Sequence, residues 1–155
     1  MDEPVNAFGR SYSLILGEIG RALDAVDPAQ VEAFMDALLD AEQIFVIGVG
    51  RVMLSLQAFA KRLNHLGIAA HCVGDINEPA ITGRDLLVVA SGSGESVVPV
   101  AIARIAKERQ ARVAHIGSNP HSSLAPMADL FVRIPVRTRL ALGDELPSEQ
   151  IMTSL

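Results

Sequence analysis

Short hydrophobic runs alternate with segments of helical periodicity along most of this chain, and this alternation restricts the possible folds more than any other feature. The runs are almost continuously apolar, which is typical of strands that are buried on both faces. We predict five strands, at residues 44–47, 69–73, 85–90, 112–116 and 130–134. Buried strands that alternate with helices form parallel sheets. The sequence therefore predicts an α/β fold with a doubly wound, five-stranded parallel sheet.

Two helices are expected before the first strand. In residues 8–26, large hydrophobic side chains recur at helical spacing, at Phe8, Tyr12, Ile15, Leu16, Ile19 and Leu23. Asp27 and Pro28 begin the second helix, because aspartate caps free amides and proline suits the first helical position. The apolar face of the first helix predicts a surface for self-association.

Further helices are expected at residues 53–66 and 97–109, and a short one, capped by a serine, at residues 122–127. Residues 143–150 have the proline and the acidic side chains that are typical of a helix opening. Because the sequence stops at Leu155, we expect it to end inside that last helix.

The chain length and the composition favour one globular domain. Its 155 residues fit a single domain, with N-terminal helices at 1–41, a sheet core at 42–135 and the start of a C-terminal helix at 144–155. Half of the residues are hydrophobic and 20% are charged, as in a folded protein. The net charge of −5, without a Lys/Arg-rich run, argues against a nucleic-acid or membrane partner.

The cysteine count and the hydropathy pattern bear on location. Cys72 is the single cysteine, so no internal disulfide forms and a reducing cytoplasm is the natural setting. No hydrophobic run approaches the roughly 18 residues of a membrane span, and the N-terminus lacks the regions of a signal peptide. We therefore expect a cytoplasmic protein. The histidines show no metal-binding spacing with one another or with Cys72, so no metal site is expected.

A glycine-rich loop, Gly48-Val49-Gly50-Arg51, follows the first predicted strand. Arg51 supplies a guanidinium that can fork onto an anion. The loop shares only the first two glycines of the dinucleotide motif G-x-G-x-x-G, because Met53 stands at the third position. This argues against NAD binding.

A second such loop, SGSGES at residues 91–96, joins the strand at 85–90 to the next helix. Its serines offer three hydroxyls, its glycines let the backbone come close, and the helix that follows presents free amides. This combination suits a phosphate, although an ordinary capped turn also uses serine and glycine. The loop lacks the lysine of the G-x-x-x-x-G-K-[ST] motif, so a nucleoside triphosphate is not favoured as its ligand. Glu95 is placed to face the site or to cap the helix from Val97, and both roles can hold at once.

These two loops resemble the SIS (sugar isomerase) domain family, which binds phosphosugars. More narrowly, GVGRVMLSLQAFAKRLNHLGIAAHCVGDINEPAI at 48–81 is similar to the 6-phospho-3-hexuloisomerase pattern of GxGRSG, A-F-A-x-R-L-x-H-L-G and a loop ending in P-A-I. The resemblance extends to SEQIMTSL at 148–155, beside S-x-Q-P-M-G-[ST]-L. It implies a flavodoxin-like, three-layer αβα sandwich, here preceded by two helices.

The resemblance also implies an enzyme, an isomerase that converts a 3-hexulose 6-phosphate to fructose 6-phosphate through an enediol. No metal or organic cofactor is implied, and family members assemble as dimers or tetramers with sites between subunits. Arg51 and Gly50 would lie beside the sugar phosphate, and the second loop would grip the phosphate itself, with Ser91, Gly92, Ser93, Gly94, Glu95 and Ser96.

The catalytic groups are also expected from the resemblance. His65 matches the family histidine, which can reach a neighbouring subunit's site, although a histidine near a helix end also suits the helix dipole. The family base is a glutamate in an F-E-Q segment, one step beyond the position of Leu155. Glu149 falls at a variable position and is not assigned this role. His121 follows a predicted strand and is expected to line the cleft.

Four departures from the family pattern leave the sugar open. Val52 and Met53 replace the serine and the glycine that follow the arginine in GxGRSG. Ile151 and Thr153 replace the proline and the glycine of P-M-G. They fall where the family holds the sugar rather than the phosphate. The alternative to an enzyme is a module that binds a phosphosugar without turning it over.

Overall fold

The computed structural model describes residues 6–138 and 143–149 of the chain. They form a parallel sheet of five strands in the order β2-β1-β3-β4-β5. The strands are β1 Ile44–Ile47, β2 Ala70–Cys72, β3 Leu86–Ala90, β4 Arg112–Gly117 and β5 Leu130–Arg133. Each strand begins and ends within about one residue of its predicted position, as boundaries set by local pattern allow. The predicted fold class is confirmed.

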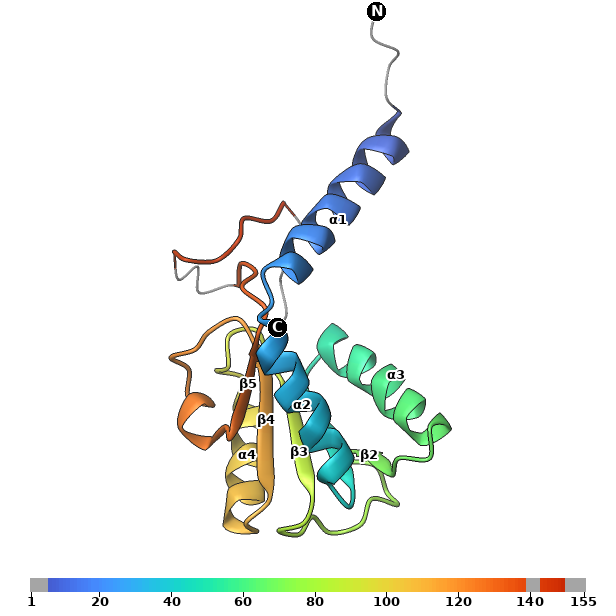
Figure 1. Ribbon diagram of the computed structural model, residues 1–155, viewed down its shortest axis with the longest axis vertical. Coiled ribbons are helices and arrows are strands. Elements are labelled where there is room, and N and C mark those ends of the chain that lie inside the picture. The colour runs from blue at the N-terminus through green and yellow to red at the C-terminus, as the bar shows by residue number, and fades with distance from the viewer. Residues whose placement is uncertain (1–5, 139–142, 150–155) are drawn as a thin grey trace, which may run out of the picture.

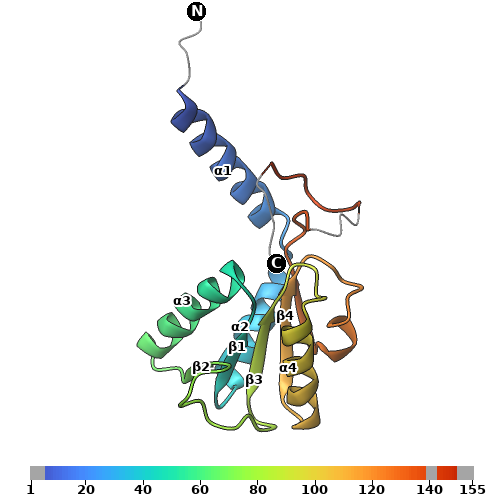
Figure 2. The same ribbon diagram turned by 180° about the vertical axis from the view of Figure 1, so that it is seen from behind.

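Helices cover both faces of the sheet and complete the expected three-layer sandwich. α2 Pro28–Asp40 and α3 Arg51–His65 lie on one face, and α4 Val97–Glu108 lies on the other (Figure 1, Figure 2). The start of α2 is as predicted, because Oδ1 of Asp27 accepts a hydrogen bond of 2.9 Å from the backbone N–H of Ala29.

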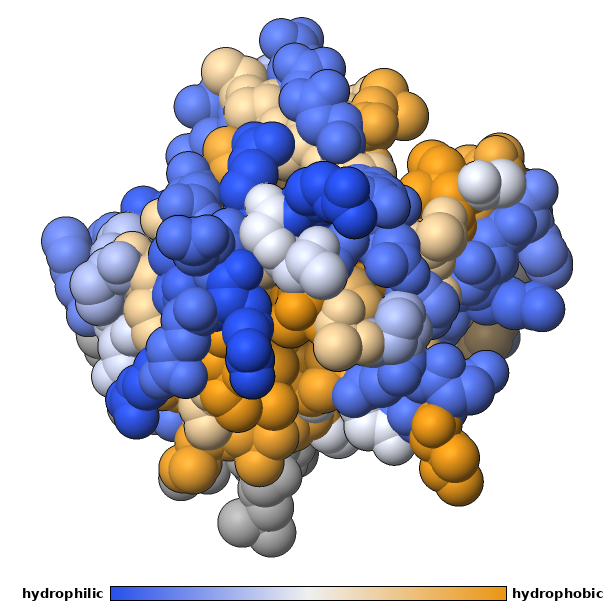
Figure 3. All heavy atoms as spheres, turned by 90° about the horizontal axis from the view of Figure 1, so that it is seen from below, coloured by the Kyte–Doolittle hydropathy of each residue, from blue (hydrophilic) through white to orange (hydrophobic). Residues whose placement is uncertain are grey.

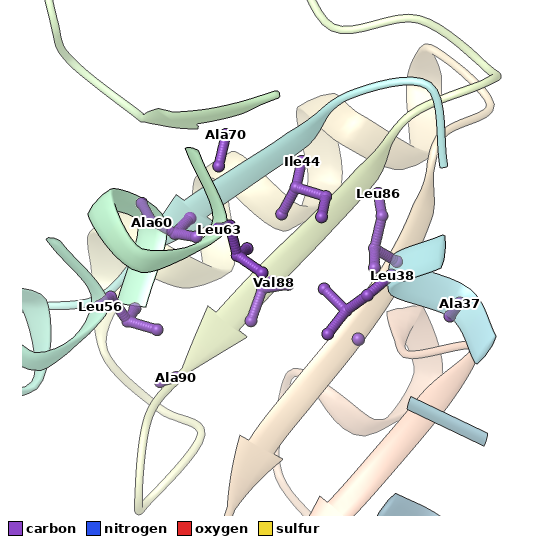
Figure 4. Packing of buried hydrophobic residues seen from close by; sticks show 12 residues of the cluster. Ala37, Leu38, Ile44, Leu56, Ala60, Leu63, Ala70, Leu86, Val88 and Ala90 are labelled. Atoms are coloured by element: carbon purple, nitrogen blue, oxygen red, sulfur yellow. The ribbon is translucent and has the colours of Figure 1, made fainter. Parts of the chain in front are cut away.

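Alternate residues of the central strands supply two separate hydrophobic cores. Ile44 and Val46 of β1 pack with side chains of α2 and α3, whereas Phe45 and Ile47 pack with α4. Figure 4 shows the first of these cores, in which Val88 lies among side chains of the two helices. Every residue of β1 and β3 is buried, which explains why the runs are continuously apolar. Burial of each such large side chain contributes roughly 1.5–3 kcal/mol.

The first helix, α1 Ala7–Asp24, projects away from the sheet at the edge where the strands end (Figure 1). Its N-terminus is capped by Asn6, whose Oδ1 accepts a hydrogen bond of 2.7 Å from the N–H of Gly9. None of its residues is buried, and its large hydrophobic side chains are 42–78% exposed, at Phe8, Tyr12, Ile15, Leu16, Ile19 and Leu23. The described part of one chain therefore leaves this apolar face uncovered.

Exposed hydrophobic side chains also occur on the sandwich itself. Met35 and Leu39 of α2, Leu54 of α3 and Leu66, which follows α3, are all more than half exposed. Figure 3 shows that hydrophobic side chains gather near the middle of the face seen from below, where the strands begin. Among the described residues, no helix has both the length and the hydropathy that a membrane span requires.

The helix expected at residues 122–127 is wrong in its extent and its cap. The structure has only a 3₁₀ turn, η1 Ala125–Met127, without a side-chain cap. The side chain of Ser122 is buried against Gly94 instead of capping a helix, although its backbone carbonyl accepts a hydrogen bond from the N–H of Ala125. Pro126 removes a further backbone donor from this turn.

The helix expected from residue 144 is absent from residues 143–149, which form bends and a parallel bridge between Val136 and Leu146. The carboxylate of Glu145 turns this segment toward the sheet, because it accepts hydrogen bonds from Oγ of Ser118, at 3.1 Å, and from Oγ1 of Thr138, at 3.0 Å. Pro147 also disfavours helical backbone at the residue before it. The rest of the expected helix, with Ile151 and Thr153, lies outside the described residues.

Candidate functional site

The two glycine-rich loops meet at the edge where the strands end. β1 and β3 are neighbours, with Ile47 paired to Val89, so the loops that follow them start side by side. A Cβ atom at Gly48 would lie 3.2 Å from the carbonyl oxygen of Ala90, which shows how closely the first loop packs on the end of β3. The strand order reverses between β1 and β3, and parallel sheets of this kind bind ligands at such a point.

The loop at residues 91–96 is held in shape by its own polar groups. The N–H of Gly94 lies 3.1 Å from Oγ of Ser91, and the N–H of Glu95 lies 3.2 Å from Oγ of Ser93. Gly94 has a φ of +68°, a conformation that glycine adopts without strain. The loop therefore turns sharply and brings its backbone to the edge of the sheet.

The N-terminus of α4 opens onto this loop without a side-chain cap. Ser96 stands at the N-cap position, but its hydroxyl lies 3.3 Å from Oγ of Ser91 and makes no capping hydrogen bond. The first turn of a helix has amides without partners inside the helix, and the helix dipole gives this end a partial positive charge. Such an arrangement binds phosphate and other anions.

Glu95 does not cap α4, which was one of the two roles expected for it. Its two carboxylate oxygens accept hydrogen bonds from Ser123, at 2.8 Å from the backbone N–H and at 2.6 Å from Oγ. The side chain thus ties the loop to the segment that follows β4. Its expected contact with a substrate stays a prediction.

Gly50 and Arg51 begin α3 at the same edge. Gly50 has a φ of +56° at the N-cap position, and Arg51 is the exposed first residue of the helix. Val52 and Met53, which depart from the family pattern, pack against the hydrophobic core that α2 and α3 share. Their side chains therefore contribute to packing at the start of α3.

His65 is the last residue of α3 and lies exposed at the far end of that helix from Arg51. A helix rises about 1.5 Å per residue, so the 15 residues of α3 separate His65 from the loops by about 20 Å. Figure 1 shows α3 running from the loop edge toward the edge where the strands begin. Within one chain, the structure therefore does not bring His65 and the 91–96 loop together.

Comparison with known protein families assigns the chain that carries this site to a family. The model of the SIS domain family matches residues 37–146, from the end of α2 to the segment after β5. The chain belongs to the SIS domain family. The matched range includes both glycine-rich loops and all five strands of this SIS domain.

Two relatives of this SIS domain have similar sequences over most of the chain. A 3-hexulose-6-phosphate isomerase of Mycobacterium gastri is 40% identical over 145 residues, which cover 94% of this chain and 72% of that protein. The protein of the same name from Bacillus subtilis is 37% identical over 121 residues, or 78% of this chain and 65% of that one. The chain thus spans about two thirds of the length of these two curated relatives.

A solved structure gives the same indication for the fold. One such structure is the crystal structure of a hypothetical protein from Methanococcus jannaschii, for which a molecular function of 3-hexulose-6-phosphate isomerase was inferred. It superposes on this chain with a TM-score of 0.74. The two sequences are 26% identical, and the match covers 85% of this chain and 77% of that one.

Several residues of the SIS domain that contact the 91–96 loop were not singled out for the site from the sequence. The N–H of Ser118 donates to the carbonyl of Gly92 at 2.9 Å, and Nδ2 of Asn119 donates to the carbonyl of Ser93 at 3.1 Å. Both follow β4, so the rule that ligands bind beyond strand ends would have found them. His121, which was expected in the cleft, is exposed two residues further on.

The segment after β5 also reaches this loop. A Cβ atom at Gly92 would lie 3.3 Å from Cγ2 of Thr138, and the carboxylate of Glu145 accepts hydrogen bonds from the N–H and Oγ1 of Thr138. The 91–96 loop is therefore bordered by the segments that follow β4 and β5.

Three described titratable groups of the SIS domain, Cys72, His115 and Asp144, have clearly shifted pKa values. Burial lowers the pKa of His115, whose imidazole has one hydrogen-bond partner among the described residues, the carbonyl oxygen of Ser91. Burial, with Asp75 and Glu78 nearby, raises the pKa of the Cys72 thiol and keeps it protonated. Residues 6–138 and 143–149 contain no cluster of three or more His, Cys, Asp or Glu residues that could hold a metal ion.

Proposed function

We propose that this protein is an isomerase that interconverts a 3-hexulose 6-phosphate and fructose 6-phosphate, with the substrate phosphate held by residues 91–96. One observation carries the proposal: the uncapped N-terminus of α4 and a glycine- and serine-rich loop meet at the point where the strand order reverses. Relatives that are 37–40% identical and are named 3-hexulose-6-phosphate isomerase support the choice of reaction.

The reaction moves a carbonyl group by one carbon, so it needs proton transfer and little else. A base removes the proton from C2 of the ketose whose carbonyl is at C3, the electron pair forms the C2–C3 double bond, and the C3 oxygen takes up a proton to give the enediol. The C2 hydroxyl then loses its proton and becomes the carbonyl, while a proton is delivered to C3. Carboxylate and imidazole groups suit these roles. In this proposal Arg51 stands beside the phosphate and adds positive charge to the loop edge.

The imidazole in this scheme is that of His65 from a second copy of the chain. Within one chain about 20 Å separate the two ends of α3, so His65 cannot serve the site that its own helix begins. An exposed histidine at a helix end is free to enter a site on a neighbouring subunit. The proposal therefore includes a homodimer or homotetramer with shared sites.

The exposed faces of the helices support assembly. The hydrophobic side chains of α1 lie uncovered in the described part of one chain. Leu39 of α2 and Leu54 of α3 are also more than half exposed. Apolar surface of this kind marks protein contacts. We also place the protein in the cytoplasm, with a role in carbohydrate metabolism, since its single cysteine suits a reducing compartment.

The test measures binding and turnover separately. Fructose 6-phosphate is expected to raise the melting temperature of the protein, whereas fructose at the same concentration leaves it unchanged. A ligand at about 100 times its dissociation constant adds about 2.7 kcal/mol to the free energy of unfolding. Conversion of 3-hexulose 6-phosphate to fructose 6-phosphate is then followed by a coupled assay.

Each outcome has one meaning. Stabilisation by the phosphorylated sugar together with turnover supports the isomerase. Stabilisation without turnover supports the alternative, a module that binds phosphosugars. Equal stabilisation by fructose, or none by either sugar, contradicts the phosphate site at residues 91–96.

A further inference from the structure

We propose that His115 positions the phosphate-binding loop, through the hydrogen bond between its Nε2 atom and the carbonyl oxygen of Ser91. This inference rests on the proposed function of residues 91–96. His115 lies on β4, is fully buried, and contacts the loop from the side of the core. It would act on the substrate only through the shape of the loop, so it is a positioning residue.

The hydrogen bond fixes the protonation of the imidazole. Nε2 of His115 lies 3.0 Å from the carbonyl oxygen of Ser91, and a carbonyl oxygen only accepts, so Nε2 must carry the hydrogen. Burial lowers the pKa of the ring and so favours its neutral form, in which Nδ1 carries no hydrogen. Among the described residues, Nδ1 has no hydrogen-bond partner.

A buried histidine nitrogen without a hydrogen-bond partner lowers the stability of a hydrophobic core. Desolvation of a polar atom without a partner costs about 1–3 kcal/mol, which an apolar side chain of similar size avoids. The ring also packs against Phe131, with the ring centroids 4.9 Å apart. The hydrogen bond to Ser91 is therefore the feature of His115 that a hydrophobic residue cannot replace.

That hydrogen bond, together with one of 3.2 Å from the N–H of Gly94 to the same carbonyl oxygen, fixes which way the next amide points. A trans peptide unit is planar, and its C=O and N–H groups point in opposite directions. Because the carbonyl of Ser91 points to His115 in the core, the N–H of Gly92 in the same peptide unit points away from the core, to the edge of the sheet. An outward amide at this position is a donor for an anion bound in the loop.

The surroundings of the ring leave little room for another arrangement. A Cβ atom at Gly117 would overlap both the Ser91 carbonyl oxygen and Nε2 of His115, so only glycine fits there. A Cβ atom at Gly94 would lie 3.3 Å from Cε1 of His115. The imidazole thus lies directly beneath the loop and contacts it at both ends of the turn from Ser91 to Gly94.

His71 provides a matched control within the same sheet. Its ring packs on Phe45 with the centroids 5.3 Å apart, and its Nε2 lies 3.0 Å from Oε1 of Gln43. The same kind of ring pair therefore occurs on β2 without any contact to the 91–96 loop. A change at His71 tests what the loss of such a pair does to the fold alone.

The experiment compares His115→Gln with His115→Met, because the two side chains have nearly the same shape and only glutamine keeps a donor near the position of Nε2. Calorimetry with fructose 6-phosphate is expected to show about tenfold weaker binding for His115→Met, and binding within about threefold of the original protein for His115→Gln. His71→Met is expected to bind as the original protein does. Equal affinity of the two His115 variants overturns the proposal.

A second measurement needs no ligand. Hydrogen exchange at the amides of residues 92–96 is expected to quicken in His115→Met and to stay slow in His115→Gln, while the amides of β3 keep their protection in both. Unchanged exchange in the loop of His115→Met overturns the positioning role. If the original protein binds no sugar phosphate, the proposed function fails and the exchange result still decides the role of His115. If His115→Met does not fold, His115→Gln decides alone, since tenfold weaker binding or quicker loop exchange in it contradicts the proposal.

Discussion

Gly94 lies directly against Ser122, and no side chain fits between them. A Cβ atom at residue 94 would overlap both Cβ and Oγ of Ser122, which is itself buried. Gly94 also has a φ of +68°. Two independent features therefore require glycine in the middle of the candidate phosphate loop, and each predicts a cost for any larger residue.

Gly94→Ala is expected to destabilise the protein and to abolish measurable binding of fructose 6-phosphate. Alanine in left-handed backbone costs about 1–2 kcal/mol, and the overlap with Ser122 adds to that cost. Gly74→Ala is the control, because Gly74 also has a positive φ, +98°, but a Cβ atom there meets nothing within 4 Å. Urea unfolding measures both variants. An equal loss of stability in the two would mean that Ser122 does not restrict residue 94.

The hydroxyl groups of the loop are expected to contribute to phosphate affinity. Ser93→Ala and Ser96→Ala should each weaken binding of fructose 6-phosphate by about 1–2 kcal/mol and leave the fold intact. Ser11→Ala, on the exposed surface of α1, is the control and should bind unchanged. Calorimetry gives the affinities and circular dichroism checks the fold. Unchanged affinity in both loop variants would move the phosphate site elsewhere.

The stability of the protein is expected to fall in mild acid because of His115. Burial lowers the pKa of this imidazole from 6.5, so the unfolded chain takes up a proton at a pH where the folded chain does not. The stability that neutral His115 contributes is complete above pH 6.5 and is lost as the pH falls from there toward the lowered pKa. The free energy of unfolding, measured at about pH 7.5 and about pH 5.5, should fall less in His115→Gln. An equal fall in both proteins would assign the loss to other groups.

Much of the fold follows from local sequence pattern. Asp27 and Pro28 mark the start of α2 because the cap and the first helical position are set by neighbouring residues. The strands were found because the residues of β1 and β3 are buried on both faces and so had to be apolar. In each case the residues that decide the structure lie within a few positions of one another.

The features that the sequence did not predict depend on distant residues. Glu145 turns residues 143–149 away from a helix by accepting a hydrogen bond from Ser118, which is 27 positions earlier. His115 stands in an apolar strand, and only the packing of β4 on β3 brings it to Ser91, 24 positions away. Neither separation leaves a periodic signal in the sequence. The 91–96 loop was identified because its serines and glycines are adjacent in the chain.

Arg133 and Asp144 form an ion pair that holds the segment after β5 near the site. Nη2 of Arg133 lies 2.5 Å from Oδ2 of Asp144, and Nε of Arg133 donates to the carbonyl of Ser118 at 3.1 Å. The hydrogen bond and the charge of Arg133 lower the pKa of Asp144. In Arg133→Met the pKa of Asp144 is expected to rise toward its ordinary value of 3.8, as followed by NMR titration. An unchanged pKa would show that the pair does not form in solution.

The apolar face of α1 is expected to hold copies of the chain together. Ile15 and Ile19 are 42% and 48% exposed within one chain, so a glutamate at both positions would charge the middle of this face without disturbing the sheet. Light scattering at micromolar concentration should give a dimer or tetramer for the original protein and a smaller species for the Ile15→Glu, Ile19→Glu double variant. Ser13→Glu, an exposed position on α1 that lies off this face, should not change the mass. If His65 serves a neighbouring site, isomerase turnover should fall with the loss of assembly. A monomeric original protein, or a double variant that assembles fully, would contradict this role of α1.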